Sequence, residues 1–301
     1  MKRARAKTRG GRQRLGKLVI FGVGLIGGSL ALALKRRKSV ARVVGVGRSR
    51  ANLLAARRLG IIDEIAASPA AALRDADLVL LAVPLGQTAA VLAQIAPHLG
   101  PRTIVTDAGS TKCDVIAHAR RYLGAAFVRF VPAHPIAGTE NSGARAAFAE
   151  LFDGHELIVT PEAETDTRAL RLVSALWKLA GMRVVKMRAT DHDRVFALVS
   201  HLPHVLAFGL VGQLAGRNDA ATLSCHTGGG FRDFTRIAGS SPEMWRDVCL
   251  ANRNALLTAL DDYLEALERL RGMIEAGDGE GLAARFAAAR AARAKWLAKK
   301  S

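Results

Sequence analysis

Hydrophobic and polar positions divide the chain into two halves with different periods. Up to about residue 190, short apolar runs rich in β-branched residues alternate with segments in which apolar residues recur every three or four positions. The runs predict strands buried on both faces of a parallel sheet, at Leu18–Phe21, Arg42–Val46, Asp77–Val83, Thr103–Asp107, Phe127–Val131, Leu157–Thr160 and Met182–Met187. Helices are expected at Ser29–Lys38, after Pro84, from about Thr111 and at Thr165–Ala180. This alternation predicts an α/β fold built on a doubly wound parallel sheet.

From about Thr190 the apolar runs disappear and only the helical period remains. The segments Val195–Leu214 and Met244–Glu275 carry apolar residues at three- and four-residue spacing, which predicts long amphipathic helices. A glycine-rich turn dense in charge, from Gly228 to Arg236, is expected between them. Wide apolar helix faces need a cover, so we expect a homodimer formed through this all-α half.

The first predicted strand leads directly into a GxGxxG pattern. It lies between a strand and a helix, and the next strand follows at the distance of a βαβ unit, which makes the pattern specific for a dinucleotide. Glycine is needed for the tight turn, for close approach of the pyrophosphate and for packing of the helix on the strand, with the phosphates at the helix N-terminus. The residues expected to bind NAD or NADP here are Gly22, Gly24, Leu25, Ile26 and Gly27.

The end of the second predicted strand bears on the choice of cofactor. Folds that prefer NAD usually carry an acid there for the ribose hydroxyl, but this chain has Gly47. The residues that follow, Arg48, Ser49 and Arg50, offer cations and a hydroxyl to a 2′-phosphate. We therefore favour NADP, and NAD stays open because a glycine there can leave both cofactors acceptable. Three further cofactor contacts are expected at the ends of later strands: Val83, Pro84 and Asp107.

The formal net charge of +18 is concentrated at the two ends of the chain. Residues 1–17 carry eight Lys or Arg and residues 281–301 carry six, with no acid in either segment, which leaves +4 for residues 18–280. We interpret the ends as solvated rather than as nucleic-acid-binding. The three cysteines are far apart and form no CxxC pair, so we expect no disulfide, no zinc site and a cytoplasmic location. The apolar run 18–34 follows basic residues as in a secretory signal, but its four glycines favour strand, turn and helix, and we expect no membrane association.

Three segments resemble the prephenate/arogenate dehydrogenase family closely and in order: 134–143 (HPIAGTENSG), 201–204 (HLPH) and 229–238 (GGFRDFTRIA). Only the basic tails lie outside the resemblance. It implies a Rossmann domain followed by an all-helical dimerisation domain. It also implies oxidative decarboxylation of prephenate to 4-hydroxyphenylpyruvate, or of arogenate to tyrosine, with hydride transfer to NAD(P)+. We predict a basic disordered tail at 1–16, the Rossmann dinucleotide-binding domain at 17–189, and a helical substrate and dimerisation domain at 190–301.

Prephenate carries a 4-hydroxyl on a cyclohexadiene ring, a ring carboxylate opposite and a pyruvyl side chain. The enzyme must accept the hydroxyl proton as hydride leaves, and must grip two carboxylates. His134 is the candidate catalytic group, because a neutral imidazole can take that proton near pH 7. The resemblance implies that Ser110 hydrogen-bonds the same hydroxyl.

Arg236 is the candidate clamp for a substrate carboxylate, because a guanidinium matches a carboxylate bidentately. Asp233 is expected either to orient an arginine by ion pairing or to cap a helix. The resemblance implies that His204 binds the side-chain end of the substrate and that His201 lines the pocket, where Pro203 places both near the first turn of a helix. Thr139 and Glu140 match family positions at the pocket mouth, with Glu140 in a gating ion pair. Trp245 either closes the pocket or belongs to the core.

Three alternatives bear on these predictions. His201 and His204 lack HExxH spacing and a third ligand, so no metal is expected. A β-hydroxyacid dehydrogenase would need a catalytic lysine in the helical half, and none occurs between Lys186 and Lys295. A non-catalytic nucleotide or redox sensor with nucleic-acid-binding tails would not need His134, Ser110 and Arg236 together. The choice between prephenate and arogenate as the substrate stays open, and His204 slightly favours prephenate. Feedback inhibition by tyrosine is a hypothesis that rests on the similarity of tyrosine to the product.

Overall fold

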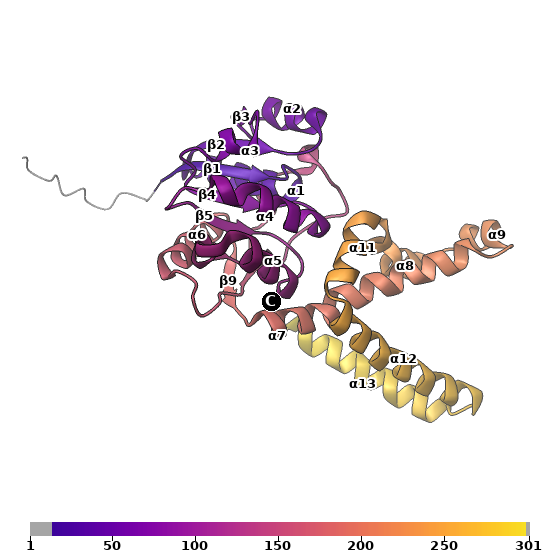
Figure 1. The fold of residues 1–301 in the computed structure, drawn as a ribbon. Helices are drawn as coiled ribbons and strands as arrows, with labels where there is room; N and C mark the ends of the chain where they lie inside the picture. Colours follow the sequence, from indigo (N-terminus) through magenta and orange to yellow (C-terminus); the bar gives the residue numbers. More distant parts are fainter. Residues whose placement is uncertain (1–13, 299–301) are drawn as a thin grey trace, which may run out of the picture. The chain divides into compact units, whose positions relative to one another are not determined.

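The computed structural model describes residues 14–298. Its main sheet has six parallel strands in the spatial order β3-β2-β1-β4-β5-β6 (Figure 1). The strands are β1 Leu15–Phe21, β2 Val40–Val46, β3 Glu64–Ile65, β4 Leu78–Leu81, β5 Ile104–Asp107 and β6 Phe130–Val131. The helices of this half are α1 Leu25–Arg36, α2 Arg50–Arg58, α3 Pro69–Leu73, α4 Thr88–Ile95, α5 Cys113–Leu123 and α6 Thr167–Leu179.

Strand β1 shows why this sheet is covered on both faces. Leu18 and Ile20 are buried in one apolar cluster with residues of α1 and α6, whereas Val19 and Phe21 are buried in a second cluster with residues of α3, α4 and α5. Successive side chains of a strand point to opposite faces, so an uninterrupted apolar run needs helices on both sides. The doubly wound Rossmann fold predicted from the sequence is therefore confirmed.

A second, three-stranded sheet follows in the chain, in the order β7-β8-β9, with bounds Ala133–Pro135, Glu156–Val159 and Arg183–Lys186. Segments 157–160 and 182–187 form strands as predicted, and β8 pairs with β9 in parallel, but both belong to this second sheet and not to the main one, and β7 pairs with β8 in antiparallel fashion. Pro132 has no amide hydrogen, and it separates β6 from β7.

Other local predictions also differ from the structure. Strand β1 begins at Leu15, which is buried and paired with Val40, so the basic tail predicted for 1–16 is shorter, and residues 1–13 lie outside the described part. Segment 124–129 is a 3₁₀ helix (η3, Gly124–Arg129), whose Phe127 is buried in the core without belonging to a strand. The short elements α2, β3 and α3 were not predicted.

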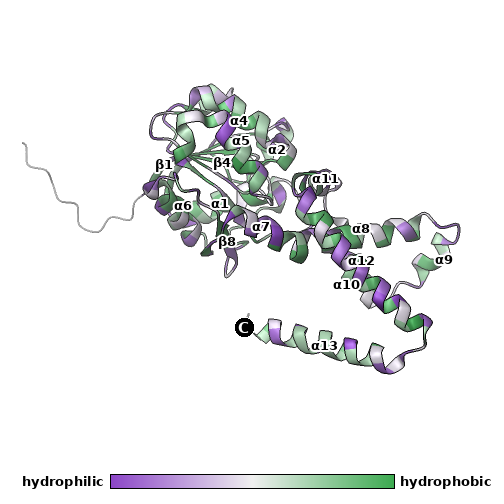
Figure 2. Ribbon diagram, turned by 60° about the horizontal axis from the view of Figure 1, so that its bottom comes forward, coloured by the Kyte–Doolittle hydropathy of each residue, from purple (hydrophilic) through white to green (hydrophobic). Residues whose placement is uncertain are grey.

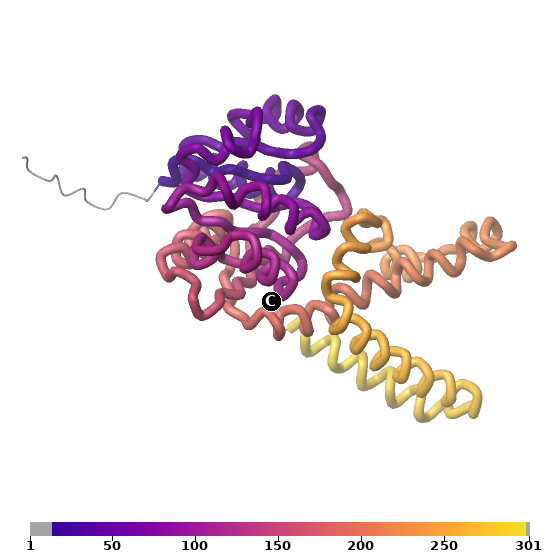
Figure 3. The backbone as a smooth tube through the Cα atoms, viewed as in Figure 1, coloured from indigo at the N-terminus to yellow at the C-terminus, as the bar shows by residue number. Residues whose placement is uncertain are grey.

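The helical half begins at Ala189, and its first helices follow one another without a break (Figure 3). A π-helical segment (η5, Ala197–His201) joins α7 (Ala189–Phe196) to α8 (Leu202–Ala215). Pro203 lies in the first turn of α8, as predicted. Because proline lacks the N–H that the α-helical ladder needs, a local change of register before it is a physical consequence of the sequence. Among the described residues, the stretch Ala189–Ala215 is long and apolar enough to cross a membrane by length and composition.

The glycine-rich segment is a helix and not the predicted turn. The further elements are α9 Ala220–Cys225, α10 Gly229–Thr235, the 3₁₀ helix η6 Arg236–Gly239 and α11 Pro242–Ala251. Helix α10 contacts α8, and such tertiary contact overrides the low helix propensity of Gly229 and Gly230.

By compactness the chain divides after Asn252. The second unit contains α12 (Arg253–Glu275) and α13 (Gly279–Ala298), which contact each other and are joined at Gly277, whose φ of +66° suits glycine. The helical structure predicted for 244–275 is confirmed, with an interruption at Asn252 between α11 and α12. In Figure 2, α12 alternates hydrophobic and hydrophilic residues. No described residue of α13 is buried, so this basic segment is solvated within its unit.

Candidate active site

The glycine pattern forms a cradle at the start of α1. Gly22 has a φ of +91°, and a Cβ there would lie 2.2 Å from the carbonyl oxygen of Ala82; a Cβ on Gly27 would lie 2.6 Å from the Gly22 oxygen. These two glycines are thus required by the fold itself. A Cβ on Gly24 would meet nothing within 4 Å, and the first turn of α1 has neither a side-chain cap nor an acid. This open space beside free helix amides fits the pyrophosphate of a dinucleotide.

Asn52 holds the cradle in place, although no sequence signal pointed to it. Its side-chain nitrogen donates to the carbonyl oxygen of Val23 at 2.7 Å, inside the glycine pattern, and its side-chain oxygen accepts from the amide of Ala144 at 2.8 Å. One side chain on α2 therefore ties the glycine loop to the segment that follows β7.

The residues after β2 lie at the carboxyl end of the sheet, as expected. Ser49 caps α2 by accepting from the amide of Asn52, and the exposed Arg48 lies 3.8 Å from a carboxylate oxygen of Glu243. A Cβ on Gly47 would make only ordinary contacts, 3.5 Å or more from Leu53. Packing around Gly47 therefore does not require a glycine at this position.

The end of β5 carries a buried ion pair. Lys112 is fully buried, pairs with a carboxylate oxygen of Asp107 and donates to the carbonyl oxygen of Ala133 at 2.8 Å. The other Asp107 oxygen accepts from the amide of Ala133 at 2.9 Å. Both backbone groups of the residue before His134 are therefore fixed. The cofactor contact proposed for Asp107 stays a prediction, and its observed role is to hold β5 and β7 together.

The loop after β4, with Val83 and Pro84, is held from the helical half. Pro84 precedes a 3₁₀ turn (η1, Leu85–Gln87), and the amide of Gly86 donates to the largely buried carboxylate of Asp247 on α11 at 3.0 Å. This hydrogen bond links the two halves of the larger unit directly beside the predicted cofactor contacts.

The half-buried His134 lies on β7 at one end of a chain of hydrogen-bonded polar groups, whose other two members, His192 and Asp193, are buried. Its Nδ1 lies 2.8 Å from Nε2 of His192 on α7, and Nδ1 of His192 lies 2.7 Å from Oδ1 of Asp193. The Asp193 carboxylate accepts from the backbone amides of Lys112 and Cys113, at 2.8 Å each, at the start of α5. Neither His192 nor Asp193 was predicted from the sequence.

Burial controls the charge of these groups. Loss of solvent lowers the pKa of His134 well below its usual 6.5, with His192 and Lys112 acting in the same direction. Burial also lowers the pKa of His192, although Asp193 opposes it. For Asp193, burial alone would raise the pKa, but hydrogen bonds from His192 and the amides of Cys113 and Lys112 bring it below its usual value. The chain therefore consists of two neutral imidazoles and one carboxylate.

His201 and His204 lie on the same helix as His192, near Trp245 of α11. The His204 ring stacks on Trp245 with centroids 3.5 Å apart, and its Nδ1 lies 2.9 Å from the Ser200 carbonyl oxygen. Asn252 lies 3.1 Å from Nδ1 of His201 and donates to the carbonyl oxygen of Asp193 at 2.7 Å. Burial lowers the pKa of His201 to about 4. Nε2 of His201 and Nε1 of Trp245 are buried without a protein partner, and a bound ligand or water would satisfy them.

The ion pair expected for Glu140 is present, and its partner, which the sequence did not identify, is Arg236: a guanidinium nitrogen and a carboxylate oxygen lie 3.6 Å apart, both exposed. Asp233 shows neither of its expected roles among the described contacts, because Gly228 is the N-cap of α10 and Arg236 pairs with Glu140. Thr139 accepts from the amide of Asn141 at 3.2 Å. Ser110 follows β5, and its backbone lies close enough to His201 to oppose the effect of burial on that pKa.

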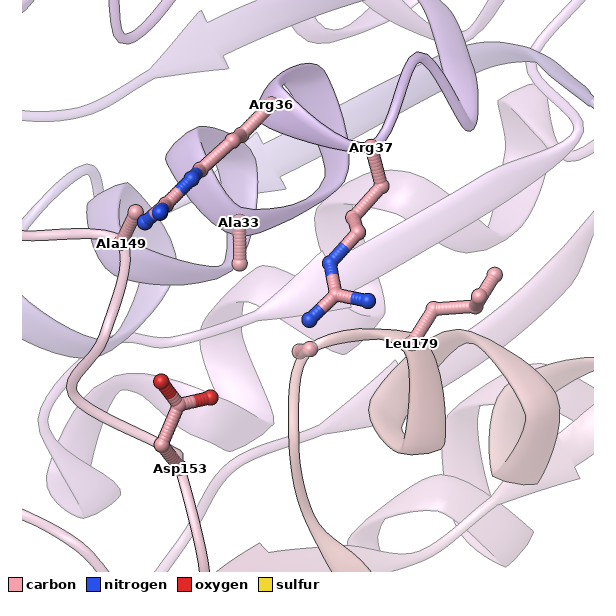
Figure 4. A pocket seen from close by; sticks show the side chains of 7 residues that line it. Ala33, Arg36, Arg37, Ala149, Asp153 and Leu179 are labelled. Atoms are coloured by element: carbon pink, nitrogen blue, oxygen red, sulfur yellow. The ribbon is translucent and has the colours of Figure 1, made fainter.

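A hollow of about 250 Å³ lies elsewhere, lined by Arg36, Arg37, Asp153 and small or apolar residues (Figure 4). It adjoins the C-terminal end of α1, which runs back to the amino ends of the strands. Because ligands of doubly wound sheets bind at the carboxyl ends, this hollow is not the cofactor site.

A Rossmann sheet with a dinucleotide cradle, a half-buried neutral histidine at its carboxyl edge and a helical half define the class as nicotinamide-dependent dehydrogenases. Residues 30–186 match the family model of the prephenate dehydrogenase nucleotide-binding domain, and residues 188–288 match that of the prephenate dehydrogenase dimerization domain. The chain therefore belongs to the prephenate dehydrogenase family and is an oxidoreductase.

Individual relatives agree with this membership. The cyclohexadienyl dehydrogenase of Zymomonas mobilis is 40% identical over 278 residues, which are 92% of this chain and 94% of that protein. The Aquifex aeolicus prephenate dehydrogenase structure in complex with hydroxyphenyl propionate and NAD+ has a TM-score of 0.88 and 35% identity, covering 93% of this chain and 98% of that one. The Synechocystis arogenate dehydrogenase structure has a TM-score of 0.76 and 30% identity, covering 93% and 99%.

Proposed function

We propose that this chain oxidises prephenate to 4-hydroxyphenylpyruvate, or arogenate to tyrosine, with loss of carbon dioxide and transfer of hydride to NAD(P)+, in tyrosine biosynthesis. The observation that carries the proposal is His134, a neutral histidine with one ring nitrogen engaged by His192, at the carboxyl edge of the sheet that holds the cradle. Its other ring nitrogen is free to accept the proton of a substrate hydroxyl. Family membership points to enzymes and gives no support to the sensor alternative.

The roles of the site residues follow from the chemistry. The nicotinamide, when bound, accepts hydride from C4 of the substrate. His134 accepts the hydroxyl proton, and Ser110 hydrogen-bonds the same hydroxyl. Arg236 binds a substrate carboxylate and must leave Glu140 to do so, so that this exposed ion pair acts as a gate at the pocket mouth. His204 binds the side-chain end of the substrate, and His201, Thr139 and Asp233 complete the pocket.

We propose NADP as the preferred cofactor, with NAD as the alternative. Gly22, Gly24, Leu25, Ile26 and Gly27 would hold the pyrophosphate. A Cβ at Gly47 would make only ordinary contacts, so packing does not demand a glycine there, while the exposed Arg48, the α2 cap Ser49 and the exposed Arg50 follow the end of β2. This arrangement leaves room and positive charge for a 2′-phosphate.

We propose a homodimer formed through the helical domain. On α12, the exposed apolar residues Leu257, Leu264, Leu267 and Ile274 follow one another at intervals of seven, three and seven. Such spacing places them in one stripe along the helix, as in a coiled-coil seam. Figure 2 shows hydrophobic positions along this helix. A stripe of large exposed apolar residues requires a cover, and a second copy of the chain supplies one.

The test is formation of reduced cofactor by the purified protein, with prephenate and arogenate each paired with NAD and NADP. We expect turnover with at least one substrate and a higher kcat/KM with NADP than with NAD. Tyrosine added at saturation tests feedback inhibition in the same assay. If the cofactor binds and no pairing gives turnover, the proposed reaction is wrong.

A further inference from the structure

We propose that His192 and Asp193 are positioning residues that hold His134 in the tautomer with the hydrogen on Nδ1, which leaves Nε2 unprotonated to act as the base. This inference rests on the proposed function for its chemistry, but the tautomer itself follows from the contacts alone. It concerns two residues that no sequence motif singled out.

The first step is the direction of the hydrogen bond between Asp193 and His192. The Asp193 carboxylate already accepts two backbone amides from the start of α5, and an ionised carboxylate can only accept. Nδ1 of His192, 2.7 Å away, must therefore carry a hydrogen and donate it. The amides of the first helical turn favour negative charge at this point, which keeps Asp193 ionised.

The protonation of His192 determines which nitrogen of His134 carries the hydrogen. His192 is fully buried and neutral, so a hydrogen on Nδ1 leaves its Nε2 as a bare acceptor. The 2.8 Å contact between that Nε2 and Nδ1 of His134 then requires His134 to donate. Because His134 is neutral as well, its own Nε2 has a lone pair and no hydrogen. The hydrogen bond made by one ring nitrogen thus sets the chemistry of the other.

The surroundings fix the two rings in this arrangement. Phe196, one turn after His192, packs against both imidazoles, with centroids 4.5 Å from His192 and 5.0 Å from His134. The backbone on one side of His134 is held by Lys112 and Asp107 through Ala133. Rotation of the His192 ring would break its hydrogen bonds to both neighbours, and this fully buried ring has no solvent contact to replace them.

The tautomer gives the reaction a defined path for its proton. As the C4–H bond breaks and hydride reduces the nicotinamide, the substrate O–H bond breaks and its proton forms a bond to Nε2 of His134. The substrate loses two electrons and the cofactor gains them. The resulting imidazolium donates through Nδ1 to His192, which in turn donates to the negative charge of Asp193. The proton stays on His134 while the ring is a dienone, and the carboxylate stabilises the positive charge through the intervening ring. The bond between the ring and its carboxylate then breaks and carbon dioxide leaves. The electron pair of that bond makes the ring aromatic and turns the C4 carbonyl into a phenolate, which takes the proton back from Nε2 of His134.

The experiment compares His192→Leu, which offers no acceptor, with His192→Gln, whose amide oxygen can occupy the position of Nε2. His155→Leu, an exposed histidine on the same domain, is the matched control. We expect His192→Leu to lower kcat about 100-fold with KM and cofactor affinity changed only a few-fold. His192→Gln should recover most of that loss, and His155→Leu should behave like wild type. Equal loss in the Leu and Gln variants, or no loss in either, would overturn the proposal.

A second readout needs no substituted His192. Ring ¹⁵N spectra of histidine-labelled, cofactor-bound wild type, assigned with His134→Asn, report which nitrogen of His134 carries the hydrogen. We expect the hydrogen on Nδ1 in the wild type and on Nε2 in a folded His192→Leu variant. A wild-type hydrogen on Nε2 would contradict the proposal. Absence of turnover with any substrate would instead contradict the proposed function, while the spectra would still decide the tautomer.

Discussion

His134 shows how burial adapts a single residue to its task. Because loss of solvent lowers its pKa well below 6.5, the imidazole stays neutral, and therefore competent as a base, at mildly acid pH. We predict that kcat measured with saturating substrate stays nearly constant from pH 8 to below 6.5 and falls only at lower pH. The measurement is a kcat profile in buffers of constant ionic strength. Loss of half the activity at or above pH 6.5 would contradict the lowered pKa.

The same burial has a consequence for stability. The pKa values of His134, His192, His201 and His204 are all lowered in the folded protein, chiefly by burial, that of His201 to about 4. Below pH 6.5 these histidines bind protons in the unfolded chain but stay neutral in the folded protein, down to their lowered pKa values. The free energy of unfolding should therefore fall as the pH drops from 6.5 toward 4, with His201 alone contributing about 2 kcal/mol at pH 5.

Urea unfolding at pH 7.5 and pH 5 measures this difference. The exposed His98 provides a control, because His98→Gln should leave the difference between the two pH values unchanged. An unfolding free energy at pH 5 equal to or above that at pH 7.5 would contradict the lowered pKa values of these histidines in the folded protein.

At the residue scale, the sequence predicted the site residues that lie in a recognisable motif, but not the residues that hold them in position. His134, Arg236 and Glu140 could be named because each belongs to a recognisable pattern, and the structure brings Arg236 to Glu140. Asn52 and the His192-Asp193 pair could not be found, because their roles depend on contacts with residues 29 to 92 positions away. A periodicity or a motif contains no information about such contacts.

At the scale of elements, the turn between β1 and α1 separates two kinds of glycine. We predict that Gly24→Ala changes the unfolding free energy by less than about 0.5 kcal/mol, since its Cβ meets nothing, but weakens cofactor binding about tenfold. Gly22→Ala should instead destabilise the fold by about 3 kcal/mol, because of its positive φ and the Ala82 carbonyl. Urea unfolding and cofactor titration by fluorescence distinguish the two. Equal losses of stability would contradict this division.

Elements with a strong period were predictable, and those shaped by partners were not. The uninterrupted run Leu18–Phe21 is apolar on both faces and could only be an inner strand. Segment 157–160 is similarly rich in aliphatic residues, yet it pairs with β7 in a separate sheet, because the pairing of strands is decided by the three-dimensional fold. The helix α10 illustrates the same limit, since two glycines at its start predicted a turn.

At the scale of the whole molecule, the stripe on α12 predicts the oligomeric state. Leu264→Glu places a charge in the middle of the exposed apolar seam and should convert the dimer to a monomer, as measured by light scattering after gel filtration. Asp262→Lys, a charge change on the opposite face of the same helix, should leave the dimer intact. A monomeric wild type, or a Leu264→Glu variant that is still dimeric, would contradict a dimer formed through this stripe.

The most direct test of the central claim is product analysis for wild type and His134→Asn. We predict that the wild type forms 4-hydroxyphenylpyruvate from prephenate, or tyrosine from arogenate, in equal amount with reduced cofactor. We further predict that His134→Asn lowers kcat about 1,000-fold while cofactor affinity is retained. Reduced cofactor without the aromatic product, or a His134→Asn variant with wild-type kcat, would contradict it.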